Sequence, residues 1–276
     1  MKKSALLATV LLGLSIPAIS QRDTIYSNRE KFACVIREVT ADAVRFSYPE
    51  EDLINAVYKN SIQKIVFKSG RVQIFSEATS YKKINSVDDY DKVTISQVEG
   101  EVRGLYKLGD VSAKAKGATT VSNQERVKER AYQKLKIGAA MMGGNVIYLT
   151  QVHTEGNRPG TAYQAGSSTE TSLSGVVYTN QLVDIDGFQK AMGDKIVFMS
   201  KQRTKLWSNA TDMKRKEYLH QFTLKSIQND NGIITLTGKL QGSDYTTFRL
   251  VNFNQEAFTI YYEDRSTAYN ITIPFK

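Results

Sequence analysis

The spacing of hydrophobic positions divides the chain into three stretches. In residues 23–76, short apolar runs alternate with turns, and Val44, Phe46 and Tyr48 follow a two-residue period. A period of two is typical of a half-buried β-strand. We therefore expect five short strands here, arranged as a small barrel or sheet.

The second stretch combines strands with one long helix. Ser122 and Glu125 have the spacing of a capping box, in which each side chain bonds a free backbone N–H at a helix start. Gly143 and Gly144 end this helix, because glycine accepts the left-handed conformation of a helix C-terminus. One helical face is apolar and predicts burial against a sheet; it consists of Val127, Ala131, Leu135, Gly138, Ala139 and Met142.

Segments on either side of the helix complete this unit. Residues 93–96 and 145–150 read as strands, which favours a βαβ-type arrangement. Four glycines between residues 100 and 117 indicate a loop-rich connection, and the Gly, Ser and Thr content of residues 154–174 predicts a mobile loop.

The third stretch, from Phe188 to Lys276, alternates apolar and polar residues with a period of two. Such alternation predicts an antiparallel β-meander with one buried face. Residues 229–232, Asn-Asp-Asn-Gly, are a strong hairpin signal. The basic segment 212–222 is expected to form a short helix before the meander.

These patterns predict an α+β protein with three units. They are a β-rich N-terminal domain at residues 21–80, an α/β middle domain at 92–182 and a β-meander C-terminal domain at 186–276. The polar segment 77–92 reads as a linker.

Residues 1–20 have the features of an export signal. Two lysines precede an apolar run at residues 5–14, and the small residues Ala18 and Ser20 stand before a cut at Gln21. The alternative is an uncut membrane anchor, but the run is short for a span. We expect a protein that is exported to the periplasm, the outer membrane or the exterior, without a transmembrane segment after cleavage.

Two resemblances add to this interpretation. Asp23-Thr24-Ile25, the run 35–40 and the run 62–71 resemble the N-terminal domain of uncharacterised exported proteins of Bacteroidetes. The middle stretch, with Val-Thr-Ile-Ser at 93–96 and Met-Gly-Gly-Asn-Val-Ile at 142–147, resembles the YbjQ-type family and the core domain of the Rcs stress-sensor outer-membrane lipoprotein. The first resemblance implies a compartment, and the second implies a helix that feeds a central strand.

The net charge of +9 is concentrated in two segments. Residues 101–140 hold nine basic and four acidic side chains, and residues 195–225 hold eight and two. Such a surplus favours contact with an anionic partner such as a membrane surface, lipopolysaccharide or nucleic acid, whereas the simpler interpretation, which we prefer from sequence alone, is a solvated basic surface. A nucleic-acid partner is not expected, because the chain has an export signal and no aromatic-rich nucleic-acid motif. The candidate binding residues are Arg126, Arg130 and Lys134, four apart on the helix, and the triplet Lys214, Arg215 and Lys216.

Motifs for catalysis, metals or cofactors do not occur in the sequence. The histidines His153 and His220 are far apart, and the single cysteine, Cys34, lies in an apolar run that predicts an inert buried thiol. There is no nucleophile elbow and no phosphate-binding glycine loop. We therefore expect no catalytic residue, no cofactor and no metal.

The expected function is a non-catalytic binding or assembly role in the cell envelope, with an envelope protein or an anionic envelope component as partner. Two alternatives stay open. The C-terminal β domain would carry an apolar ligand, or the protein would be a hydrolase without a recognisable motif.

Overall fold

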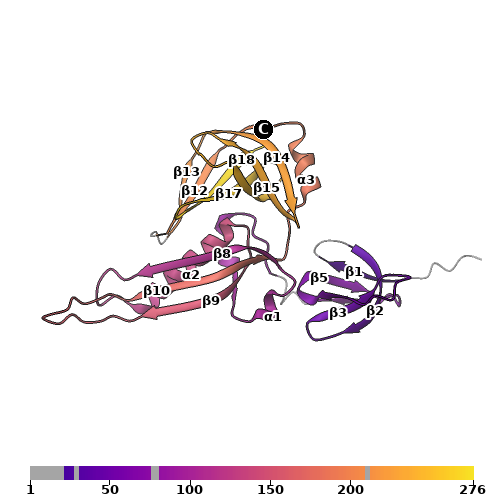
Figure 1. The fold of residues 1–276 in the computed structure, drawn as a ribbon, viewed down its shortest axis with the longest axis horizontal. Helices are drawn as coiled ribbons and strands as arrows, with labels where there is room; N and C mark the ends of the chain where they lie inside the picture. Colours follow the sequence, from indigo (N-terminus) through magenta and orange to yellow (C-terminus); the bar gives the residue numbers. More distant parts are fainter. Residues whose placement is uncertain (1–21, 28–30, 76–80, 209–211) are drawn as a thin grey trace, which may run out of the picture.

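A computed structural model describes residues 22–27, 31–75, 81–208 and 212–276. Three sheets and few helices make the chain β-rich (Figure 1), which confirms the expected α+β class with a predominance of strands. The expected export signal at residues 1–20 lies outside the described residues. None of the described helices is both long and apolar enough to cross a membrane.

The N-terminal sheet has six strands in the order β4-β3-β2-β1-β5-β6. Their bounds are β1 Asp23–Ser27, β2 Lys31–Val39, β3 Ala43–Ser47, β4 Asn55–Tyr58, β5 Ile62–Val66 and β6 Val72–Ile74, with the 3₁₀ turn η1 at Lys59–Ser61. The core of this sheet is small and contains Ile25, Cys34, Val44 and Phe46. The side-chain amide of Asn60 donates to the carbonyl oxygen of Glu101 at 2.8 Å, which ties the sheet to the middle region.

The middle region is a four-stranded sheet in the order β7-β9-β10-β8, with a long helix on one face. Its elements are η2 Val87–Lys92, β7 Thr94–Ser96, α1 Glu99–Val102, β8 Tyr106–Lys116, α2 Gln124–Met141, β9 Val146–Glu155 and β10 Glu170–Thr179. Strands β7 and β9 are parallel, as a βαβ-type unit requires. The chain between them also contains α1 and β8, so the connection is not a simple crossover.

Three expectations for this region are wrong. The stretch expected to be loop-rich contains α1 and then β8. The pairing of β8 with β10 shifts register between Val177 and Tyr178, where Leu108 is the extra residue of a β-bulge. The expected linker at 77–92 contains η2, and Val87 is buried against α2. The expected mobile loop 154–174 is shorter, because β9 runs to Glu155 and β10 begins at Glu170.

Helix α2 begins one residue later than predicted. Its N-cap is Asn123, whose side-chain oxygen accepts from the backbone N–H of Arg126 at 3.0 Å, so the predicted capping box is wrong. The predicted end is confirmed, since Gly143 has a φ of +82°, which a residue with a Cβ rarely adopts. Leu135 is fully buried against the sheet, as the apolar stripe predicted.

The C-terminal region is an eight-stranded antiparallel sheet that closes on itself (Figure 1). Its elements are α3 Ile185–Met192, β11 Val197–Met199, β12 Gln202–Trp207, β13 Lys214–Glu217, β14 Gln221–Asp230, β15 Ile233–Leu240, β16 Thr247–Phe253, β17 Ala257–Asp264 and β18 Thr267–Pro274. Strand β11 pairs with β14, and two residues later β12 pairs with β18, at the other end of the meander. This bent segment therefore joins the first and last meander strands into a barrel.

The meander prediction is confirmed in outline. The Asn231-Gly232 pair forms the tight turn between β14 and β15, with φ values of +51° and +90°. The short basic helix expected at 212–222 is wrong, because this segment contains β13 and the start of β14. The barrel interior is filled by side chains that are at most 2% exposed, among them Phe188, Phe198, Phe222, Phe248 and Phe258.

The barrel sits on α2, so that the helix is covered by the sheet on one side and by the barrel on the other (Figure 1). The amide of Asn270 donates to the carbonyl oxygen of Met141 at 2.9 Å, and both groups are buried. Leu206, Val251 and Tyr261 of the barrel join the core of the middle region. The middle and C-terminal regions thus share a core.

Candidate functional site

The three basic residues expected to share one stripe of α2 have different environments. Arg126 is exposed, and Arg130 is half-buried with its guanidinium donating to the carbonyl oxygen of Lys116 at 3.0 Å. Lys134 is only 3% exposed, and its ammonium donates to the carbonyl oxygen of Ser208 in the barrel. Burial lowers the pKa of Lys134. These residues do not form a common exposed surface, because the barrel covers α2 at Lys134.

The basic triplet is divided by strand geometry. Side chains alternate along β13, so Lys214 and Lys216 lie on one face and Arg215 on the other. The guanidinium of Arg215 bonds the carboxylate of Asp88 at 2.7 Å and thereby connects the barrel to η2. Only Lys214 and Lys216 are therefore free to act together.

Two residues that the sequence analysis did not single out join these lysines. In the β12–β13 pairing, Arg203 lies opposite Lys216, and Lys205 lies opposite Lys214. Directly opposite residues of an antiparallel pair share a face, with Cβ atoms about 4.5–5.5 Å apart. Arg203, Lys205, Lys214 and Lys216 form the basic cluster.

Aromatic rings accompany the basic cluster. The guanidinium of Arg203 lies 4.3 Å from the ring centre of Tyr218, and the ammonium of Lys205 lies 5.0 Å from that of Tyr269. The ammonium of Lys214 lies 5.3 Å from the ring of Trp207. Contacts at this range are favourable cation–π interactions and hold the long side chains in place.

The basic cluster lies at the end of the barrel opposite α3. Phe188 of α3 packs on Phe258 and Phe275, near one end of β17 and β18. At the other end of these strands, Tyr262 and Tyr269 stack with ring centres 4.7 Å apart. Because Tyr269 is directly opposite Lys205, one end of the barrel is closed by α3 and the other carries the cations and tyrosines.

The electrostatics of the basic cluster favour an anion. None of the ion pairs between described residues involves its four members. The pKa of Lys205 is lowered, first by partial burial and then by the charges of Arg203 and Lys216. Like charges opposite each other destabilise a strand pair, and a bound anion relieves this repulsion.

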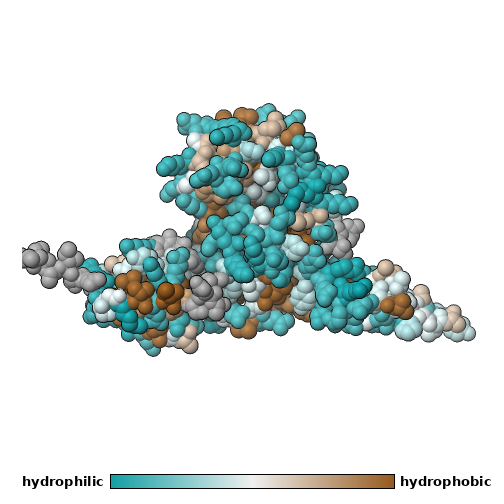
Figure 2. Space-filling view, turned by 180° about the vertical axis from the view of Figure 1, so that it is seen from behind, coloured by the Kyte–Doolittle hydropathy of each residue, from teal (hydrophilic) through white to brown (hydrophobic). Residues whose placement is uncertain are grey.

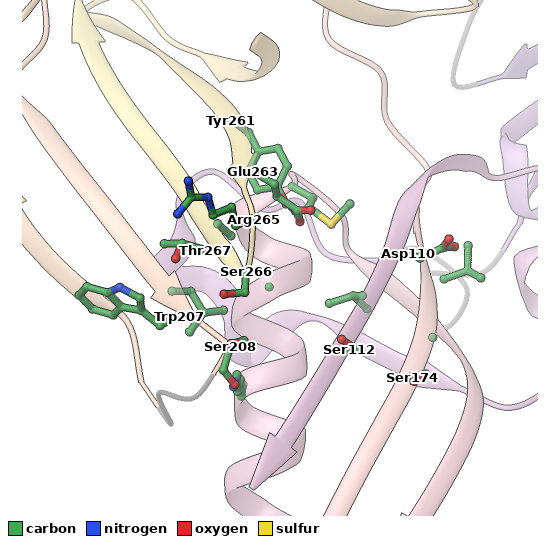
Figure 3. Close-up of a pocket in the computed structure, with 18 of the residues that line it drawn as sticks. Asp110, Ser112, Ser174, Trp207, Ser208, Tyr261, Glu263, Arg265, Ser266 and Thr267 are labelled. Carbon is green, nitrogen blue, oxygen red and sulfur yellow. Dashed lines mark hydrogen bonds between the residues drawn. The ribbon is translucent and has the colours of Figure 1, made fainter. Parts of the chain in front are cut away.

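A groove opens between the barrel and the middle region, beside their shared core (Figure 3). It encloses about 490 Å³ and passes between β8, α2 and the barrel strands β12, β17 and β18. It also reaches Thr150 of β9 and residues 174–176 of β10. In the close-up, Asp110 and Ser112 lie on the β8 side, and Ser208, Ser266 and Thr267 lie on the barrel side. Arg265, in the turn between β17 and β18, has a φ of +53°, an uncommon value for a residue other than glycine.

Other groups with potential chemistry are dispersed over the structure, although His220 lies next to the basic cluster through its contact with Tyr218. Within the described ranges, no three His, Cys, Asp or Glu residues are grouped as a metal site would need. Cys34 is buried, and burial, together with the charge of Asp23, raises the pKa of its thiol to about 11. His153 is exposed beside Glu155, whereas His220 stacks on Tyr218 at 3.9 Å, so the two histidines lie in different regions.

Comparison with known proteins gives no assignment. No family model matches the chain, and no curated protein or solved structure matches it. The resemblances to exported proteins of Bacteroidetes, to the YbjQ-type family and to the Rcs stress sensor therefore stay predictions.

Proposed function

We propose that this chain is a non-catalytic binding protein of the cell envelope, and that its basic cluster binds an anionic envelope component. One observation carries the proposal: cations lie directly opposite cations in the β12–β13 hairpin, Arg203 opposite Lys216 and Lys205 opposite Lys214. These cations have no carboxylate partner among the described residues, although partners would stabilise the hairpin. An external anion supplies the missing charge.

The expected compartment and the surrounding rings favour a component of the envelope surface. The export signal expected at residues 1–20 would bring the protein to anionic lipids or lipopolysaccharide. Basic residues near an anionic membrane each contribute about 1 kcal/mol to binding. Trp207, Tyr245 and Tyr269 are partly exposed rings at the same end of the barrel, and such rings are common at membrane interfaces.

Co-sedimentation with vesicles tests this function. The full chain without residues 1–20 is mixed with vesicles of phosphatidylglycerol and phosphatidylcholine in equal parts, with phosphatidylcholine alone, or with lipopolysaccharide. Replacement of all four basic-cluster residues by Gln should abolish binding to the anionic samples. A matched variant with Lys190, Lys225, Lys239 and Lys276 changed to Gln removes the same charge from exposed positions elsewhere. Equal loss of vesicle binding in both variants would show that the binding depends on net charge and not on the basic cluster.

The alternatives gain less support. A carrier of an apolar ligand needs space inside the C-terminal barrel, where aromatic side chains are packed with ring centres 5.2–5.5 Å apart, as for Phe198, Phe222 and Phe248 with their neighbours. A hydrolase needs a nucleophile with a positioned base. In the groove the hydroxyl of Tyr261 donates to the carboxylate of Glu263, but burial raises the pKa of Tyr261, which disfavours its ionised, nucleophilic form.

Of the domains predicted at 21–80, 92–182 and 186–276, we propose that the first is independent and that the other two form one unit. Separate hydrophobic cores support an independent N-terminal domain. The shared core at Leu206, Val251 and Tyr261 favours a joint middle and C-terminal unit. Limited proteolysis should release the N-terminal domain first and leave η2, the middle region and the C-terminal region as one fragment, because Val87 of η2 is buried in their core.

A further inference from the structure

The outer edge of β8 has no strand beside it in the described part of the chain. β8 is the last strand of its sheet, and β10 lies on its inner side. The backbone N–H of Gly117 donates to the carbonyl oxygen of Thr169 at 2.8 Å, on the β10 side. Because the bonding direction alternates along an antiparallel strand, the main chain of Asp110, Ser112 and Lys114 points away from β10.

The two ends of this edge are already bonded. At one end the guanidinium of Arg249 donates to the carbonyl oxygen of Leu108 at 2.5 Å. At the other end Arg130 donates to the carbonyl oxygen of Lys116 at 3.0 Å. Between them, the outward N–H and C=O groups of residues 110, 112 and 114 have no partner among the described residues. The open edge spans about 14 Å, at about 3.4 Å per residue.

This edge borders the groove of Figure 3. Asp110 and Ser112 form one side of the groove, Lys134 and Gly138 of α2 contribute to its base, and the barrel forms the opposite side. The volume of about 490 Å³ lies in the range of pockets that enclose a small ligand. An added strand would therefore be enclosed on more than one side.

We infer that the groove receives an extended segment of about five residues from a partner protein, which adds as a strand to β8. N–H and C=O groups that repeat along a strand edge are matched by another peptide main chain. The charged side chains that line the groove are balanced, with Lys134 and Arg265 against Asp110 and Glu263. Recognition is thus expected through the main chain rather than through net charge.

The usual protection of an exposed edge is weak here. Residues 110–114, Asp-Val-Ser-Ala-Lys, contain no proline, and the bulge lies before them. The two charged side chains are engaged within the region, since Lys114 bonds Glu170 at 2.6 Å and Asp110 lies 3.3 Å from Lys107. Neither charge is left unpaired against an incoming strand.

A pair of variants at one position tests the inference. Ser112→Pro removes an outward N–H and leaves the bonds to β10 intact, whereas Ser112→Ala keeps the N–H. A phage-displayed library of random octapeptides is selected on the wild-type protein. Enriched peptides should bind Ser112→Ala like the wild type and bind Ser112→Pro at least tenfold more weakly. In hydrogen exchange, they should slow the amides of residues 110, 112 and 114.

Two further results decide the matter independently of how Ser112→Pro folds. N-methyl groups can be placed on every second residue of an enriched peptide in two ways. The set that blocks the amides facing β8 should abolish binding to the wild type, and the other set should leave binding unchanged. Failure to enrich any peptide, or binding that leaves the three amides unprotected, would overturn the inference. Because vesicle binding does not involve β8, loss of this site leaves the proposed lipid-binding function intact.

Discussion

Arg203 and Lys216 lie directly opposite each other on β12 and β13, and neither has an ion-pair partner among the described residues. Lys205 and Lys214 repeat this relationship two positions further along the hairpin. In a hairpin that served stability alone, we would expect residues of opposite charge at directly opposite positions. A binding role explains why four cations lie together on one face of the hairpin.

Reversal of one of these charges should therefore separate stability from binding. Lys216→Glu places a carboxylate opposite Arg203 and should raise the free energy of unfolding by about 0.2–1 kcal/mol. The same change should weaken binding to anionic vesicles. Urea denaturation and co-sedimentation measure the two effects, with Lys225→Glu as an exposed control on β14. A stability loss specific to Lys216→Glu would show that the cations do not repel each other.

The core beneath α2 should be sensitive to truncation. Leu135 is fully buried between the helix and the middle sheet. Leu135→Ala should lower the free energy of unfolding by about 2–5 kcal/mol, because a large side chain is removed from a packed site. Chemical denaturation checks the value. A change below about 0.5 kcal/mol would mean that this side chain does not support the core.

The ion pair between Arg215 and Asp88 should contribute little to stability by itself. Its side chains are 36% and 57% exposed, and water screens such a pair. A double-mutant cycle with Arg215→Ala and Asp88→Ala should give a coupling energy of less than about 1 kcal/mol. A coupling of several kcal/mol would indicate that this contact fixes the barrel on the middle region.

Cys34 gives a prediction about alkaline pH. Its thiol has a pKa of about 11 in the folded protein, above the usual value of 9.0, because burial disfavours the thiolate. A group with a raised pKa contributes its full stability below the pKa that it has in the unfolded state. This contribution is lost as the pH rises toward the pKa of the folded state. Stability should fall between about pH 9 and pH 11 less steeply in Cys34→Val than in the wild type. Denaturant unfolding across this window measures the difference, and identical slopes would contradict the assignment.

The same cysteine should be unreactive in the native state. A thiol reagent added at pH 8 should modify Cys34 only after denaturant is added, since the residue is fully buried and protonated. Rapid modification of the folded protein would show that the N-terminal sheet opens readily.

The sequence predicted those elements whose local chemistry agrees with their tertiary environment. The Asn231-Gly232 turn and the helix end at Gly143 both require positive φ, and both residue types supply it. The apolar stripe that includes Leu135 faces the sheet as its spacing indicated. These features depend on a few neighbouring residues and can be recognised without the fold.

The candidate site was only partly predictable, because it depends on pairing between strands. Lys214 and Lys216 were singled out, but Arg203 and Lys205 join them only through the β12–β13 register. The alternation of cations at 203 and 205, and again at 214 and 216, is a strand signal, and the helix expected at 212–222 obscured the second pair. Lys134 was placed on an exposed stripe because a helix buried on two sides cannot be inferred from one apolar face.

The central claim is that the basic cluster binds an anionic surface by charge, and a salt titration tests it most directly. Binding of the wild-type chain to vesicles of phosphatidylglycerol and phosphatidylcholine is measured as ionic strength rises, while the Debye length falls from about 30 Å at 0.01 M to about 8 Å at 0.15 M. The wild type should bind at low salt and lose affinity steeply. Removal of each cluster cation should cost about fivefold at low salt, which corresponds to about 1 kcal/mol per residue. No binding at low salt, or equal binding by the wild type and the variant in which all four cations are Gln, would contradict the account.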